Sequence, residues 1–138
     1  MLLFNLIPVF VKYSLLLKIP PLLMLSVCYV ESHYRNITNN IAHGICQVKL
    51  DTARYMLPHL DMLSLRQNET NIYVASMYLR YQYERYGNDW EKAVLAYNAG
   101  GVYYNDYNNE YTNKQYLIKV KTQYNKMKGR LSDKKISP

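Results

Sequence analysis

Apolar residues recur at helical spacing along most of this chain, and no window alternates between apolar and polar side chains as a half-buried strand does. This pattern predicts an all-α fold. The clearest helix begins at Pro21, because proline fits the first turn of a helix, and it places Leu23, Val27, Val30 and Tyr34 at helical spacing. With 138 residues, 49% of them hydrophobic, the chain is long enough for one compact domain and too short for two typical ones.

Proline, glycine and capping residues set the ends of the next two predicted helices. The first covers residues 47–57 and stops before Pro58, which cannot continue a helix. The second starts at Asn68 or Thr70, either of which can cap a helix, and stops at Gly87. Short connections between these helices fit a single domain.

The C-terminal third of the chain contains two more predicted helices. A short one follows Asp89 and ends at Gly100, and a longer one begins after Asn113. Between them we expect a loop rich in tyrosine and asparagine, and after Gly129 a frayed basic tail. The predicted organisation is an apolar N-terminal segment, one helical domain and a basic tail, at residues 1–12, 13–129 and 130–138.

The apolar N-terminus admits three interpretations. A membrane span needs about 20 apolar residues in a row, and Lys12, Lys18 and Pro20 interrupt this stretch. A signal peptide needs a basic start and a small-residue cleavage site, and the sequence shows neither. We therefore favour a core helix, with an uncleaved or degenerate export signal as the second interpretation.

The excess of 17 Lys and Arg over 10 Asp and Glu gives a net charge of +7, which predicts an anionic partner. Nucleic acid, a membrane surface and an acidic polymer all qualify. The densest basic cluster runs from Lys119 to Lys135, and such a run is usually a solvated helix face. We expect no nucleic-acid binding. These basic residues could also contact an anionic envelope surface.

The two cysteines, Cys28 and Cys46, can be read in two ways. They could form a disulfide, but the sequence gives no distance between them. We expect two separate, buried, apolar side chains instead. His43 lies three residues before Cys46 without a second paired motif, so we predict no metal site, and a Cys46–His43 nucleophilic pair is equally weakly supported.

Glu31 is the single acidic residue among residues 1–50. It follows Val27 by four residues and Leu23 by eight, so it shares their apolar helix face. A carboxyl group in such a position loses hydration, which raises its pKa and lets it donate a proton near neutral pH. Position alone also permits a glutamate that faces solvent or pairs with Arg35.

Five short segments, taken in order, favour the catalytic interpretation. They are Tyr29-Val30-Glu31-Ser32, Gly44-Ile45-Cys46-Gln47, Asn71-Ile72 with Tyr78-Leu79, Ala96-Tyr97-Asn98-Ala99-Gly100, and Tyr116 with Val120. In this order and spacing the chain resembles the catalytic domain of the soluble lytic transglycosylases, the SLT family, which is similar to goose-type lysozyme. The resemblance covers roughly residues 13–125.

The resemblance implies a lysozyme-like helical fold that cleaves the MurNAc–GlcNAc β-1,4 bond of peptidoglycan. It makes Glu31 the catalytic acid and base. It places Gln47, Tyr97 and Asn98 in the glycan cleft and Tyr116 near the glutamate. Ser32, grouped here with the substrate-binding residues, would hold the local backbone. The implied partner is a peptidoglycan glycan strand bound by a monomer, without cofactor or metal.

A single carboxyl group favours transglycosylation over hydrolysis. Most glycosidases use two carboxylates, and none follows Glu31 closely in sequence, although Asp51, Asp61 and Glu69 could approach it in space. A lytic transglycosylase needs one acid, which forms a 1,6-anhydromuramyl end without consuming water. The expected site of action is the cell envelope or periplasm, or the cell wall after delivery by a phage.

The sequence also departs from the family pattern. The loop at residues 33–43 is short, and Ile41, Ala42 and His43 stand where the family often has a serine, so a polar contact to substrate is expected to be missing. The alternative function is therefore a non-catalytic peptidoglycan-binding or assembly subunit that keeps the fold.

Overall fold

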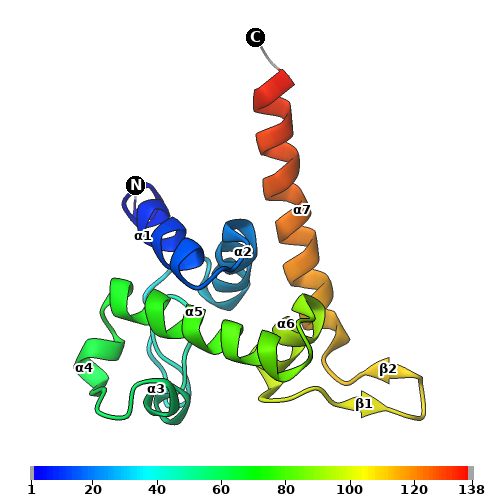
Figure 1. Cartoon of the computed structure of the whole chain (residues 1–138), viewed down its shortest axis with the longest axis horizontal. Helices are drawn as coiled ribbons and strands as arrows, with labels where there is room; N and C mark the ends of the chain where they lie inside the picture. Colours follow the sequence, from blue (N-terminus) through cyan, green and yellow to red (C-terminus); the bar gives the residue numbers. More distant parts are fainter. Residues whose placement is uncertain (1, 137–138) are drawn as a thin grey trace.

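Helices make up most of the regular structure in residues 2–136, the part of the chain that the computed structural model describes. A single two-stranded hairpin accompanies them (Figure 1). The all-α prediction is confirmed. The elements are α1 (Leu2–Leu16), α2 (Pro21–Ser32), α3 (Leu50–Met56), α4 (Met62–Leu65), α5 (Asn68–Arg85), α6 (Trp90–Ala99), β1 (Tyr104–Asn105), β2 (Glu110–Tyr111) and α7 (Lys114–Ile136).

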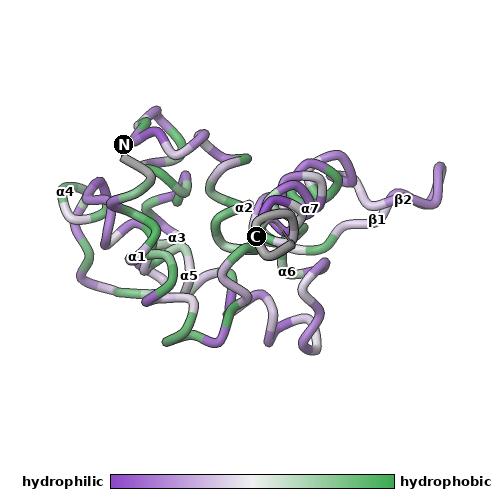
Figure 2. The backbone as a smooth tube through the Cα atoms, turned by 90° about the horizontal axis from the view of Figure 1, so that it is seen from above, coloured by the Kyte–Doolittle hydropathy of each residue, from purple (hydrophilic) through white to green (hydrophobic). Residues whose placement is uncertain are grey.

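Helix α5 is the centre of the packing. It contacts α1, α3, α4 and α6, while α7 packs against α2 and α6. The core forms where these helices meet and includes Met24 and Val27 of α2, Ile72 and Leu79 of α5, and Leu95 of α6, all fully buried. Figure 2 shows the resulting contrast between the hydrophobic α2 near the middle and the mostly hydrophilic α7 and hairpin.

Local signals place the ends of the two helices that matter most for the site. Helix α2 starts at Pro21 and ends because His33 adopts a left-handed conformation (φ 56°), with its N–H donating to the Tyr29 carbonyl at 2.7 Å. Helix α6 is capped by Asp89, which accepts from the Lys92 N–H at 3.0 Å, and it ends at Gly100 with φ 81°. The predicted start of α2 and both predicted ends of α6 are confirmed, but Tyr34, expected to continue the helix from Pro21, lies beyond its end with φ 62°.

The start of α3 and the cap of α5 differ from the predictions. Helix α3 begins at Leu50 rather than at residue 47, because Gln47 is left-handed (φ 52°) and Lys49 is extended. Helix α5 begins at Asn68 with Gln67 in the capping position, so neither predicted side-chain cap forms.

Two further differences lie near the C-terminus. The predicted loop contains the hairpin, in which Tyr104 pairs with Tyr111 and Asn105 with Glu110; strands of two residues are too short to show alternation. Helix α7 continues past Gly129 to Ile136, so the expected basic tail is helical over that range. An isolated glycine within a helical pattern is tolerated at modest cost.

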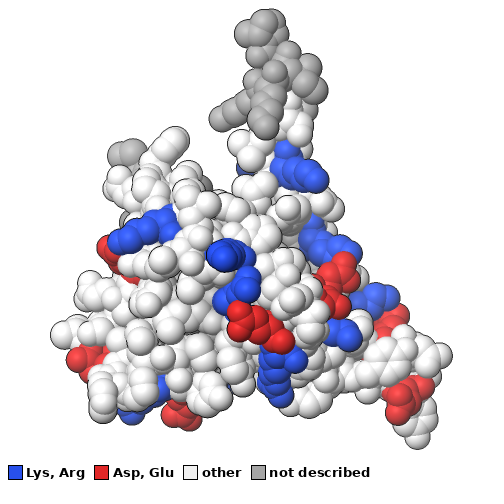
Figure 3. Space-filling model, viewed as in Figure 1, with Lys and Arg blue, Asp and Glu red and all other residues white. Residues whose placement is uncertain are grey.

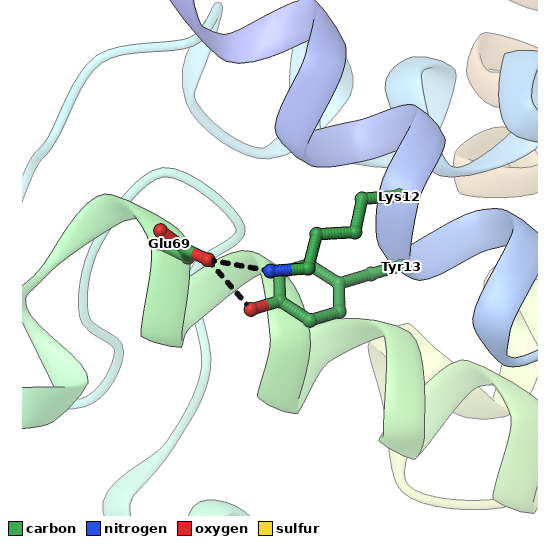
Figure 4. Close-up of polar contacts among 3 residues, drawn as sticks. All are labelled: Lys12, Tyr13 and Glu69. Atoms are coloured by element: carbon green, nitrogen blue, oxygen red, sulfur yellow. Dashed lines mark hydrogen bonds and ion pairs between the residues drawn. The ribbon is translucent and has the colours of Figure 1, made fainter.

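The N-terminal stretch forms a helix whose inner face joins the core, as the core-helix interpretation predicts. Leu6 and Phe10 of α1 are buried against the rest of the domain. Glu69 of α5 accepts from Lys12 Nζ at 3.2 Å and from the Tyr13 hydroxyl at 2.8 Å (Figure 4). This exposed ion pair aligns α1 with α5 but adds little stability. No helix in the described residues is both long and apolar enough to cross a membrane.

Candidate active site

Glu31 lies in the last turn of α2, half-buried, and is held by a side chain from α7. Its Oε2 accepts a hydrogen bond from the Tyr116 hydroxyl at 2.5 Å. Burial raises the pKa of the Glu31 carboxyl above its ordinary value, and the bond from Tyr116 offsets part of that rise. Arg35 does not pair with it: its Nε donates to the Ser32 carbonyl at 3.0 Å.

A cavity of about 200 Å³ lies beside Glu31. Of the six site residues predicted from the sequence, four share its wall, namely Glu31, Gln47, Tyr97 and Asn98, and Tyr116 reaches Glu31 by its hydrogen bond. The remaining lining residues are Ala42, Val48, Lys49, Thr52, Tyr78 and Gly100. The wall therefore combines α2, α3, α5, α6 and the segment between α2 and α3.

Ser32 is the predicted site residue that does not line this cavity. Its side chain is buried, and its hydroxyl donates to the Ile45 carbonyl at 2.5 Å. It also accepts from the Arg35 N–H at 3.1 Å. The structure thus gives Ser32 a backbone-holding position next to Glu31 rather than a place in the cavity wall.

Asn71 fixes the segment that carries Gln47. This side chain of α5 is fully buried. Its Oδ1 accepts from the Cys46 N–H at 2.8 Å, and its Nδ2 donates to the carbonyls of His43 at 2.8 Å and Leu65 at 2.9 Å. In the sequence, Asn71 stands out only as part of a motif. The sequence signal for its structural role is a polar side chain next to Ile72 on a mostly apolar helix face.

The turn at residues 44–47 requires an unusual backbone. Gly44 has φ 81°, and a Cβ at this position would lie 2.3 Å from Asn71 Nδ2, so only glycine fits. Gln47 is also left-handed, and its Nε2 donates to the carbonyls of Ile37 at 2.7 Å and Gly44 at 2.9 Å. Both amide hydrogens of Gln47 are therefore used to hold the turn.

A disulfide joins Cys28 of α2 to Cys46 of this turn. The expectation of two separate apolar cysteines is wrong, because the fold brings their Cα atoms within 4.4 Å, which the sequence could not reveal. The carbonyl of Cys46 accepts from the Tyr97 hydroxyl at 2.6 Å. The turn is consequently fastened to α2, α5 and α6 at once.

The phenols beside Glu31 are held in their neutral form. Burial and the nearby Glu31 carboxylate raise the pKa of Tyr97 and of Tyr116 well above the ordinary value for tyrosine. Both hydroxyls therefore remain hydrogen-bond donors at neutral pH. Next to Tyr97, Asn98 Oδ1 accepts from Asn113 Nδ2 at 2.8 Å, which links the end of α6 to the start of α7.

The chain matches a known protein family over most of its length. The family model described as the transglycosylase SLT domain matches residues 9–120. The chain belongs to this family. No curated protein matches the chain.

Two solved structures resemble this SLT domain. One is a complex of the 70-kDa soluble lytic transglycosylase with bulgecin A, with a TM-score of 0.62 and 25% identity over 67% of this chain. The other is the 70 kDa soluble lytic transglycosylase from Escherichia coli, with a TM-score of 0.64 and 27% identity over 67% of this chain. The match covers 16% of each of those longer chains. The lysozyme-like helical fold is thereby confirmed.

Within the described part of the SLT domain, Glu31 is the one carboxylate that lines the cavity. Of the three acids considered from the sequence, Asp61 caps α4 by accepting from the Ser64 N–H, and Glu69 binds Lys12 and Tyr13. Asp51 lies on the exposed side of α3 and lines two neighbouring grooves instead. None of them supplies a second acid beside Glu31.

A separate groove of about 430 Å³ lies beside the SLT-domain cavity, along α3 and α5. The two share Thr52, Tyr78 and Gly100 in the wall between them. Tyr55 and Tyr81 add aromatic rings to its wall, with centroids 5.4 Å apart. The sequence alone predicts none of these side chains for the site, because their convergence depends on the packing of α3 on α5.

Proposed function

We propose that this SLT domain is a peptidoglycan lytic transglycosylase in which Glu31 is both acid and base. The observation that carries the proposal is a half-buried carboxyl group, hydrogen-bonded to Tyr116 and alone among the described acids in lining the cavity. The bond cleaved is the MurNAc–GlcNAc β-1,4 linkage. Membership of the SLT family and likeness to two lytic transglycosylase structures support this assignment.

The proposed reaction has two proton transfers at one carboxyl group. Glu31 first donates its proton to the glycosidic oxygen, so the bond from C1 to that oxygen breaks and an oxocarbenium-like sugar forms. The carboxylate then removes the proton of the muramyl C6 hydroxyl, whose oxygen attacks C1. The products are a free GlcNAc hydroxyl and a 1,6-anhydromuramyl end. Glu31 ends protonated, and no water is consumed.

The surroundings of Glu31 suit both steps. Burial raises its pKa, which favours the protonated form that the first step requires. The Tyr116 hydroxyl stabilises the carboxylate that exists between the two transfers. A hydrolase would need a second carboxylate to activate water or to form a glycosyl intermediate, so the single acid supports the transglycosylase route.

We assign the substrate contacts to the residues that share the cavity with Glu31. The Tyr97 hydroxyl donates a hydrogen bond to the Cys46 carbonyl, so the aromatic ring of Tyr97 is the part available to a sugar face. Gln47 uses both amide hydrogens within the turn, so its amide oxygen would accept from a sugar hydroxyl. Asn98 completes this wall. Ala42, from the short loop, also lines the cavity and offers no polar side chain to the glycan.

Peptidoglycan as the substrate implies action at the cell wall. We propose the envelope or periplasm as the location, reached by export or by phage-borne delivery. The excess of positive charge on the chain, +7, fits a polymer that carries peptide carboxylates.

The test is the Glu31→Gln variant on purified peptidoglycan. We expect complete loss of released muropeptides with retained folding, while the matched Glu69→Gln variant, which changes an acid outside the cavity, stays active. Mass spectrometry of wild-type products should show anhydromuramyl ends, each lighter by one water than a hydrolysed end. Full activity of Glu31→Gln would contradict the assignment of Glu31 as the catalytic acid and base. Glycan binding without any wild-type product would instead indicate a non-catalytic binding subunit.

A further inference from the structure

The outward face of α1 carries an apolar stripe that nothing in the described part of the chain covers. Phe4, Ile7, Val11 and Leu15 follow one another at spacings of three and four residues, so they lie on one side of the helix. Phe4 is 80% exposed and Leu15 is 67% exposed, and Ile7 is also exposed. Leu6 and Phe10, which lie outside this stripe, are buried in the core.

This arrangement is unusual for a helix on a protein surface. Such a helix normally turns charged or polar side chains away from the core. In α1 the polar residues Asn5 and Lys12 lie on the flank, and the side facing away from the core carries none of the charged residues of the helix. Contiguous exposed apolar side chains of this kind mark an interaction site.

The charge of the chain favours one occupant for the stripe. A second copy of this chain would also carry +7, so two copies would repel each other on approach. An anionic phospholipid surface would attract the chain and offer acyl chains to Phe4 and Leu15.

Helix α7 adds further exposed positive charge. Lys119, Lys126, Lys128 and Arg130 form no ion pair within the described residues, unlike Lys114 and Lys121. Figure 1 shows the start of α1 and the projecting end of α7 pointing to the same side, and Figure 3 shows basic side chains along α7. Exposed cations together with an apolar helix face are the combination that binds anionic lipid.

We propose that α1 docks this domain on an anionic phospholipid surface, with Phe4, Ile7, Val11 and Leu15 entering the lipid interface. This contact is separate from the proposed catalysis. Helices α1 and α3 lie on opposite sides of α5 (Figure 1), and α3 supplies Thr52 to the cavity wall. Docking through α1 therefore leaves the Glu31 cavity open to a glycan strand away from the lipid.

The test is sedimentation of the full chain with vesicles. One set contains phosphatidylglycerol and phosphatidylcholine in equal parts, and the other contains phosphatidylcholine alone. We expect binding to the mixed vesicles that weakens at high salt, and weaker binding to the neutral ones. The Phe4→Gln/Leu15→Gln double variant should bind the mixed vesicles roughly tenfold more weakly.

Leu63→Gln is the matched control, because Leu63 of α4 is 71% exposed and lies outside the stripe. It should bind as wild type does. If the double variant fails to fold, the single variant Leu15→Gln replaces it in the sedimentation experiment, and it should bind the mixed vesicles at an intermediate level. Wild-type binding by the double variant, or no vesicle binding by the wild-type chain, would overturn the proposal. A wild-type dimer that the double variant abolishes, without vesicle binding, would assign the stripe to a second copy and would overturn it equally.

Discussion

The hydroxyl of Tyr116 donates to Oε2 of Glu31 at 2.5 Å, across 85 residues of sequence. This bond and the burial of Glu31 act in opposite directions on the same group. Burial raises the pKa of the carboxyl, and the hydrogen bond lowers it by stabilising the ionised form. Tyr116 thus positions Glu31 and also sets the balance between its two protonation states.

The first prediction concerns Tyr116→Phe. Loss of the donor removes the effect that lowers the Glu31 pKa, so this pKa should rise. Since the proposed reaction begins from protonated Glu31, the decline of activity at alkaline pH should move to higher pH. The maximal rate should fall about tenfold, because the carboxylate formed during the reaction loses a charge-assisted bond. Turnover of purified peptidoglycan, measured across the pH range, checks both effects.

Tyr124→Phe is the control for this experiment. Tyr124 also belongs to α7 and packs against the core, and it lines a separate apolar groove near Trp90. Its variant should keep the wild-type pH profile. An unchanged profile in Tyr116→Phe would show that the bond has no part in the titration of Glu31.

The second prediction concerns the stability of Glu31→Gln. The pKa of Glu31 in the folded protein is raised above its ordinary value of 4.5. The native state therefore keeps a proton that the unfolded state has lost, and stability falls as pH rises from the unfolded pKa through the folded pKa. Glutamine carries no charge to desolvate and can still accept from Tyr116. We expect a higher melting temperature than wild type at pH 7.

The melting-temperature difference should disappear at pH values well below 4.5, where wild-type Glu31 is protonated in both states. Thermal unfolding followed by circular dichroism at several pH values gives this comparison. A difference of the same size at acid and neutral pH would mean that charge burial is not its cause.

Features set by neighbouring residues could be predicted from the sequence. The start of α2 at Pro21, the Asp89 cap and the Gly100 stop of α6 depend on a few adjacent residues, and each is as predicted. The apolar surroundings of Glu31 also followed from its helical spacing to Val27, since that spacing is a local property.

Features that depend on distant contacts could not be predicted in this way. The left-handed Gln47 shortened a predicted helix because the turn it belongs to is fastened by Asn71 from another helix. The disulfide depends on the approach of α2 to that same turn. Only the family resemblance predicts that Tyr116 lies near Glu31, because no helical periodicity relates residues so far apart in sequence.

The third prediction concerns the Cys28–Cys46 disulfide. The two cysteines are separated by 18 positions, and closing a loop of this length in the unfolded chain is worth about 3 kcal/mol of folding free energy. The Cys28→Ser/Cys46→Ser variant should lose about that amount in denaturant titrations. Its activity should also fall, because the turn whose Cys46 carbonyl holds the Tyr97 hydroxyl at the cavity wall loses its covalent attachment to α2.

Reduction supplies the control for the disulfide. Dithiothreitol should lower the unfolding midpoint of the wild-type chain to that of the double variant and leave the double variant unchanged. If dithiothreitol has no effect on the wild type while free-thiol labelling shows full reduction, the crosslink contributes nothing to stability.

The fourth prediction compares two glycines that share a left-handed backbone. Gly44 and Gly87 have φ 81° and 71°, but a Cβ on Gly44 would meet Asn71 Nδ2 at 2.3 Å, whereas a Cβ on Gly87 would meet nothing within 4 Å. Gly87→Ala should therefore cost about 1 kcal/mol, the strain of a left-handed alanine. Gly44→Ala should cost about 3 kcal/mol or more, since Asn71 holds three backbone groups and cannot move aside without breaking those bonds.

Activity separates the two variants further. The turn at Gly44 carries Gln47 and Cys46 into the wall beside Glu31, so Gly44→Ala should reduce peptidoglycan cleavage at temperatures where the variant is still folded. Gly87 ends α5 outside the cavity, and its alanine variant should cleave at the wild-type rate. Equal stability losses and equal rates for the two variants would show that Asn71 yields to the added methyl group and does not fix the turn.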